Sequence, residues 1–279
     1  MGEPFIGSEM LREGRLTPYA LRSRYRAILP DVYLPTGTEP TAITRAKAVW
    51  LWTRRQGVVA GQSAAALHDA RWVDARRPAE VQWDNRHAPR GVTVWSDAVA
   101  DDEIESVGSV QVTTPARTAL DLARRYPLGP AVAAIDALAR ATRLKIADVE
   151  LLAERYKGHR GMRRARTALG LVDVGAESPQ ETRIRLLMIR NGFPRPETQI
   201  PVYDECGVLI AELDMGWRDT MIAIDYEGDH HRRTRREFNK GIRRHDAVTE
   251  LGWHDIRVTS ADTDGGIVGR VAEAFRHRA

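Results

Sequence analysis

Residues 208–228 read VLIAELDMGWRDTMIAIDYEG and largely determine how the C-terminal part of the chain is interpreted. We predict a first strand over 208–214, a turn over 216–219 and a second strand over 221–227. Because side chains alternate along a strand, Asp225 and Glu227 point to the same face. Asp214 ends the first strand. The stretch therefore predicts a β-hairpin with acidic side chains on both strands.

Acidic side chains at i and i+2, beside a third across a hairpin, repel one another unless a cation neutralises them. We therefore predict a divalent cation, Mg²⁺ or Mn²⁺, with Asp214, Asp225 and Glu227 as its ligands. A tight turn would pair Asp214 near Met221 and leave Asp225 about 13 Å away along the strand. A wider turn or a bulge is then required. The alternative is that the acidic cluster is purely structural.

The segments on either side of the hairpin supply further candidates. A helix is predicted over 179–191, with Glu181 one turn from its start, where its carboxylate could reach the hairpin. Gln199 could line the same cleft. His231 follows the hairpin and is a candidate for proton transfer, or a simple hydrogen-bond partner of the acids.

A basic stretch over 230–245 begins just after the acidic residues. It is either a solvated helix face or a stripe that grips the DNA backbone. In the second interpretation, the residues that contact DNA phosphates are Arg232, Arg233, Arg235, Arg236 and Lys240.

The N-terminal segment, residues 1–75, has the spacing of a helix-turn-helix. A helix is predicted over 7–13 and a second over 17–28, opened by Thr17 as N-cap and Pro18 in the first turn. Leu21, Tyr25 and Ile28 form the predicted buried stripe. The exposed face then carries Arg22, Ser23, Arg24 and Arg26. With a hairpin over 29–36 as the wing, this pattern predicts a winged helix that contacts DNA, although winged helices also bind proteins.

The remaining helices and strands give a mixed α/β (α+β) fold. Helices are also predicted over 41–55 and 63–70. The middle α/β segment, 76–172, contains strands near Val81 and over 92–95 and 110–113, and helices over 118–125, 131–141 and 146–156. We expect no chemistry there. A linker over 172–179 leads to the C-terminal unit, 177–279, where a mixed sheet flanked by helices is expected.

Composition excludes several classes of protein. The 279 residues are 43% hydrophobic and 29% charged, which is typical of a folded protein and not of a disordered or collagen-like chain. Cys206 is the only cysteine, so an intrachain disulfide and a Cys-rich zinc site are excluded. No apolar run is long enough to span a membrane, and Met1–Met10 lacks the pattern of a secretion signal. A cytoplasmic location is expected.

Two known families resemble this chain. Glu181, Asp214, Asp225-Tyr226-Glu227-Gly228 and His231, followed by Leu251-Gly252-Trp253, resemble the endonuclease-like family related to very-short-patch repair endonucleases, in the PD-(D/E)XK superfamily. The winged-helix start, Ala64-Ala65-Ala66-Leu67-His68 and residues 114–123 (TPARTALDLA) resemble the antitoxins of abortive-infection (type IV) toxin–antitoxin systems. The first resemblance implies a restriction-endonuclease-like domain that hydrolyses DNA.

These resemblances imply two alternative functions. In the first, Asp214 with Asp225 or Glu227 binds Mg²⁺ or Mn²⁺, Glu181 positions a water or a second ion, and His231 transfers a proton. The superfamily usually has lysine where this chain has Glu227, which leaves that role to His231 or Lys240. In the second, the chain is a non-catalytic DNA-binding antitoxin or transcriptional regulator. Expected partners are DNA and a cognate toxin protein. Whether the chain forms a homodimer is left open.

Overall fold

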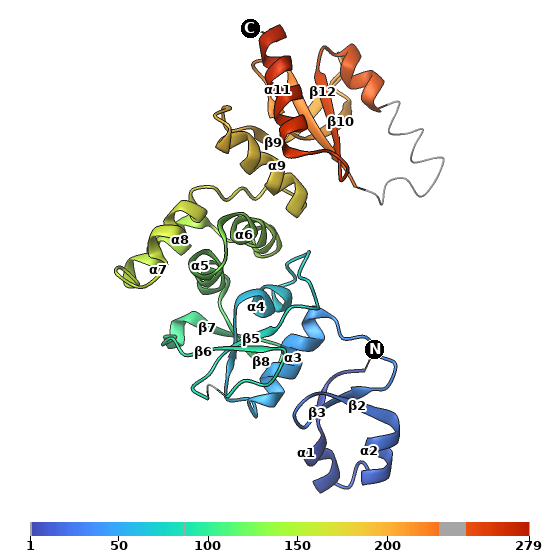
Figure 1. Cartoon of the computed structure of the whole chain (residues 1–279), viewed down its shortest axis with the longest axis vertical. Helices are drawn as coiled ribbons and strands as arrows, with labels where there is room; N and C mark the ends of the chain where they lie inside the picture. The colour runs from blue at the N-terminus through green and yellow to red at the C-terminus, as the bar shows by residue number, and fades with distance from the viewer. Residues whose placement is uncertain (1, 86, 229–243, 279) are drawn as a thin grey trace. The chain divides into compact units, whose positions relative to one another are not determined.

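The computed structural model describes residues 2–85, 87–228 and 244–278. Its helices, two mixed sheets and one antiparallel sheet confirm the predicted mixed α/β class (Figure 1). The chain divides into two compact units, residues 1–172 and 173–279. The division lies at the start of the segment predicted as a linker. Among the described residues, no helix has the length and apolar character needed to cross a membrane.

The first unit begins with a small three-stranded sheet and two short helices. Its elements are β1 (Phe5–Ile6), α1 (Gly7–Arg12), α2 (Pro18–Arg24), β2 (Tyr25–Leu29), β3 (Val32–Pro35) and α3 (Ala42–Trp52). The strand order is β1-β3-β2. The Thr17 side chain caps α2 by accepting a hydrogen bond from the Ala20 N–H at 3.1 Å, and Pro18 opens the first turn, as predicted.

Helix α2 is shorter than predicted, and residues 25–28 lie on a strand instead. Tyr25–Leu29 pairs antiparallel with β3, where Arg26 is opposite Leu34. The Tyr25 and Phe5 rings also form a T-shaped pair, with centroids 4.9 Å apart. Sheet pairing thus overrides the helical periodicity of Leu21, Tyr25 and Ile28. Arg26 was wrongly predicted to lie on the helix.

A five-stranded sheet forms the larger part of the first unit. Its elements are β4 (Val58–Val59), β5 (Ala79–Gln82), β6 (Val92–Trp95), β7 (Ile104–Val107) and β8 (Val110–Thr113), with α4 (Gly61–Leu67) after β4. The order is β6-β5-β4-β8-β7, and β4 pairs with both β5 and β8. The sheet therefore crosses residue 75, so segments 1–75 and 76–172 fold as one unit.

Four helices complete the first unit (Figure 1). They are α5 (Pro115–Arg125), α6 (Leu128–Thr142), α7 (Ile146–Arg155) and α8 (Met162–Leu169). In α5, Arg117 is fully buried; its guanidinium contacts the carboxylate of Glu103 and lies 2.8 Å from that of Asp121. Tyr156 also donates a hydrogen bond to Glu103. This ionic cluster connects α5 to the segment before β7 and to the end of α7.

The second unit is a four-stranded sheet with helices. Its elements are α9 (Pro179–Arg190), β9 (Glu197–Tyr203), β10 (Leu209–Trp217), β11 (Ile222–Glu227), β12 (His254–Thr259) and α11 (Asp264–Arg278), with residues 244–250 also helical. The order is β12-β11-β10-β9, and only β11 and β12 are parallel among these pairs. Ile184 and Met188 of α9 and Ile267 of α11 pack against Met215 and Ile224.

The hairpin of β10 and β11 turns later than predicted. Strand β10 continues to Trp217, which pairs with Ile222, so the turn lies at 218–221 and not at 216–219. Gly216 permits this close pairing, since an added Cβ would lie 2.4 Å from the carbonyl oxygen of Ile222. The later turn shifts the register so that Asp214 lies beside Asp225.

Candidate active site

Asp214 and Asp225 lie where β10 and β11 separate. Backbone pairing of the two strands ends at Met215 and Ile224. Beyond this point the two side chains replace the backbone ladder: the Asp214 N–H donates to Oδ1 of Asp225 at 2.9 Å, and the Tyr226 N–H donates to Oδ2 of Asp214 at 2.7 Å. The 13 Å separation that a tight turn would give is therefore absent.

The surroundings of both carboxyl groups disfavour their ionisation. Burial raises the pKa of Asp214 to about 8, and the negative charges of Asp225 and Glu181 add to this effect. Burial also raises the pKa of Asp225 to about 6, where the nearby Arg244 acts in the opposite direction. Like charges in a poorly solvated site share protons or require a cation. The pair therefore resembles a functional carboxyl pair more than a surface cluster.

Glu181 is held next to the pair by the first turn of α9. Ser178 caps this helix by accepting a hydrogen bond from the Glu181 N–H at 3.2 Å, and the Glu177 N–H donates to Oε2 of Glu181 at 2.8 Å. The Gln199 amide lies 3.5 Å from the same oxygen. Gln199 has a φ of +50°, unusual for a residue other than glycine, and sits between the strand partners of Leu213 and Met215.

Arg244 was not among the predicted site residues, although it belongs to the basic stretch 230–245. It is the first described residue of the helical stretch 244–250, and its Nη2 lies 2.8 Å from Oδ2 of Asp225. The same nitrogen donates to the carbonyl oxygen of Glu212. Sequence reasoning could not single out Arg244, because the helix that carries it reaches Asp225 only in the folded sheet.

Glu227 does not join the aspartates as a third ligand. Its carboxylate forms an ion pair with Arg257, which is next to Asp225 in the parallel register of β11 and β12. Within residues 2–85, 87–228 and 244–278, no group of three or more His, Cys, Asp or Glu side chains could hold a metal ion. The predicted three-carboxylate site is thus reduced to Asp214 and Asp225.

Several predicted residues fall outside the described part of the chain. These are His231, Arg232, Arg233, Arg235, Arg236 and Lys240. Their predicted contacts with the reacting phosphate and the DNA backbone stay predictions.

Three of the four residues predicted to contact DNA from α2 lie on this helix, and the fourth lies on a strand. Arg22, Ser23 and Arg24 are exposed on the helix. Arg26 lies on β2, and its guanidinium donates to the Thr38 carbonyl at 2.7 Å. Tyr19, whose exposed fraction is 77%, shares the exposed surface of α2 and was missed. Its position four residues before Ser23 is the sequence signal that could have indicated it.

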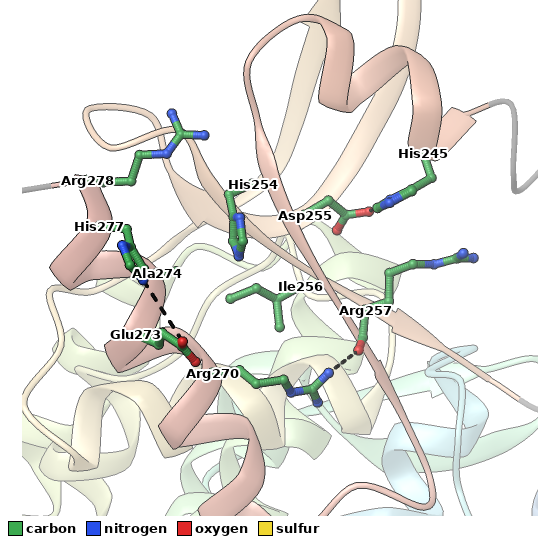
Figure 2. Close-up of a pocket in the computed structure, with 10 residues that line it drawn as sticks. All are labelled: His245, His254, Asp255, Ile256, Arg257, Arg270, Glu273, Ala274, His277 and Arg278. Atoms are coloured by element: carbon green, nitrogen blue, oxygen red, sulfur yellow. Dashed lines mark hydrogen bonds and ion pairs between the residues drawn. The ribbon is translucent and has the colours of Figure 1, made fainter.

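A cavity of about 710 Å³ lies elsewhere in the second unit, along β12 and α11 (Figure 2). Figure 2 shows Asp255 and His245 pointing toward one another, at 2.8 Å, and the Arg270 guanidinium reaching the Arg257 carbonyl. Neither Asp214 nor Asp225 lines this cavity. Two of its lining charges, Asp255 and Arg270, pair with His245 and Asp262, and we assign the cavity no ligand.

Comparisons with known proteins place the chain beside two uncharacterised relatives. Uncharacterized protein MT2308 of Mycobacterium tuberculosis (strain CDC 1551 / Oshkosh) and Uncharacterized protein Rv2248 of the same species (strain ATCC 25618 / H37Rv) are each 31% identical over 172 residues. The match covers 61% of this chain and 63% of each relative, so the chain spans less than two thirds of their length. No family model matches the sequence, and no solved structure matches it.

Proposed function

We propose that the protein binds DNA and hydrolyses its phosphodiester bonds at Asp214 and Asp225 with the help of a divalent cation. The supporting observation is the position of the two carboxylates, side by side where the strands separate, with raised pKa values. Two buried acids that repel one another are suited to a cation. Because DNA is the proposed substrate, we also place the protein in the cytoplasm.

The two aspartates fit Mg²⁺ or Mn²⁺ by the chemistry of their oxygens. Magnesium is commonly held by one or two carboxylates, and water and substrate phosphate complete its coordination. Oδ2 of Asp214 and Oδ1 of Asp225 each accept one backbone hydrogen bond, which fixes both carboxylates. Arg244 contacts the other oxygen of Asp225 and would have to move aside or share it. Glu227 does not fit, since Arg257 already pairs with it.

Each residue of the site would have its own role in hydrolysis. A bound divalent cation would neutralise the phosphate and lower the pKa of the attacking water. Asp214 and Asp225 would hold that cation, and Glu181 would orient the water by accepting its hydrogen bond. Arg244 would balance negative charge on the phosphate, a role for which its guanidinium is suited. Arg22, Ser23 and Arg24 of α2 would dock the duplex.

The second candidate is a non-catalytic DNA-binding antitoxin or transcriptional regulator, and the arginine contacts of the site favour it. Arg244 pairs with Asp225 and Arg257 pairs with Glu227, so both carboxylates have a positive partner within the chain. In this alternative, the carboxylates serve the stability of the second unit, and a cognate toxin protein or a second copy of the chain is the partner. DNA binding by α2 is common to both candidates.

One experiment separates the two candidates. Purified full-length protein is incubated with supercoiled plasmid DNA and Mg²⁺ or Mn²⁺, and nicking is followed on gels. We expect nicking that Asp214→Ala and Asp225→Ala reduce by at least about a hundredfold, as for loss of groups central to catalysis. Glu227→Gln is the matched control and should retain nicking. Retained activity in the aspartate variants, or none in the parent protein, refutes the nuclease.

A further inference from the structure

The segment from the end of α7 through α8 is strongly basic. Residues 155–172 include six Lys or Arg and no Asp or Glu. We define the α8 cationic surface as Lys157, Arg160, Arg163, Arg164 and Arg166, all of which are exposed. This part of the chain had been expected to carry no chemistry, and the proposed nuclease site makes no use of it.

Most of this charge has no acidic partner among the residues that the structure describes. Lys157 pairs with Glu154, and Arg164 donates to the Tyr126 carbonyl at 3.4 Å. Over the described ranges of the chain, Arg160, Arg163 and Arg166 form no ion pair. Neighbouring like charges on a helix are mildly destabilising. The stability of the folded unit therefore does not explain why so many arginines lie together here.

The backbone that presents these side chains is fixed. Met162 and Ala165 of α8 are buried, and the helix packs against α5, α6 and α7. Nε of Arg124 donates to the Arg160 carbonyl at 3.3 Å. Gly161 has a φ of +89°, and an added Cβ there would lie 2.5 Å from the Arg124 carbonyl oxygen. The arginines thus project from a preformed scaffold, which lowers the entropy cost of binding.

We propose that the α8 cationic surface binds the phosphodiester backbone of duplex DNA without reading its sequence. Arginine is suited to this contact, because its planar guanidinium can donate two parallel hydrogen bonds to one phosphate. An acidic protein is a less suitable partner for this surface, because the centres of protein–protein interfaces are depleted of charged residues and enriched in aromatic ones. Between Lys157 and Ala168, every exposed residue is Lys, Arg, His, Gly or Thr.

The proposal takes DNA from the proposed function but does not require hydrolysis, and the experiment keeps the two apart. Binding of full-length protein to a random-sequence DNA duplex is measured by fluorescence anisotropy in EDTA, over a series of salt concentrations. The test variant combines Arg160→Ala, Arg163→Ala and Arg166→Ala. Each lost phosphate contact lowers the slope of log K against log[salt] by about 0.9. We expect the slope to fall by roughly three, with at least about tenfold weaker binding at low salt.

A matched variant controls for net charge. Arg12→Ala, Arg76→Ala and Arg276→Ala also remove three exposed arginines, but from α1, a loop and α11. The slope of this control should stay near that of the parent protein. An equal fall in both variants, or no fall in the test variant, overturns the proposal. Tighter binding of an RNA duplex of the same sequence overturns the assignment to DNA. Nicking is scored separately, so a failed nuclease leaves this result interpretable.

Discussion

Nη2 of Arg244 lies 2.8 Å from Oδ2 of Asp225, so that a guanidinium contacts the carboxyl pair where the proposed function requires a metal ion. Both groups are held from elsewhere in the fold. Asp225 accepts the Asp214 N–H, and Arg244 also donates to the Glu212 carbonyl. Arg244 is therefore an internal counter-ion for the pair, and a divalent cation must compete with it.

This competition predicts that Arg244→Ala strengthens metal binding. With the guanidinium removed, Asp225 loses the cation that contacts its carboxylate, and Mn²⁺ affinity measured by titration calorimetry should rise by about tenfold, or 1.4 kcal/mol. Arg244→Lys retains the charge and should change the affinity less. Unchanged or weaker Mn²⁺ binding in Arg244→Ala would mean that the arginine helps to form the site and does not compete with the ion.

The raised pKa of Asp214 predicts how stability depends on pH without metal. Between about pH 4 and 8, folded Asp214 keeps a proton that the unfolded chain has lost. The unfolded state then binds fewer protons, so the free energy of unfolding falls as pH rises through this window. Asp214→Asn removes the titrating group and should flatten this dependence. In EDTA at pH 8, the variant should be more stable by at least about 1 kcal/mol, as measured by urea denaturation.

The α2 surface predicts unequal effects for arginines that are close in sequence. Arg22→Ala with Arg24→Ala should weaken DNA binding in a gel shift by about tenfold, since both side chains are exposed on the proposed docking helix. Arg26→Ala is the matched control, because its guanidinium is engaged with the Thr38 carbonyl on the neighbouring hairpin. Equal losses in the two proteins would remove the special role of α2.

Arg117 predicts a large effect on stability in the first unit. Its side chain is fully buried between the carboxylates of Glu103 and Asp121. Arg117→Met would leave these acids buried without their cation, at a cost of about 3–5 kcal/mol. Thermal or urea unfolding of the first unit should report this loss. Arg76→Met changes an arginine that is exposed beside Asp74 and should cost little.

Much of the fold could be predicted from local signals. The cap at Thr17 marked a helix start, because its hydroxyl group satisfies a free N–H group of the first turn. The alternation of residues 221–227 marked β11. Helix α2 was extended too far, since Tyr25 and Ile28 fit a helical period as well as a strand, and only pairing with β3 decides between them.

The acidic residues of the candidate site could be predicted from the sequence, but the residues that they contact could not. The pairing of Asp214 with Asp225 depends on a late turn, which the close approach of Gly216 to Ile222 permits and which no local motif indicated. Arg244 and Arg257 reach the acids through packing between segments distant in sequence. Glu227 was therefore predicted as a metal ligand, although in the structure its carboxylate pairs with Arg257 of the neighbouring strand.

The two-residue strand β4 also has a practical consequence for the isolation of helix α2, which we propose to contact DNA. Val58 and Val59 depend on β5 and β8 for their hydrogen bonds. A fragment that ends at residue 75 would lack those neighbouring strands. Its unpaired backbone groups and exposed valines could pair with other molecules, which is a common route to aggregation. The smallest autonomous piece should instead extend to residue 172.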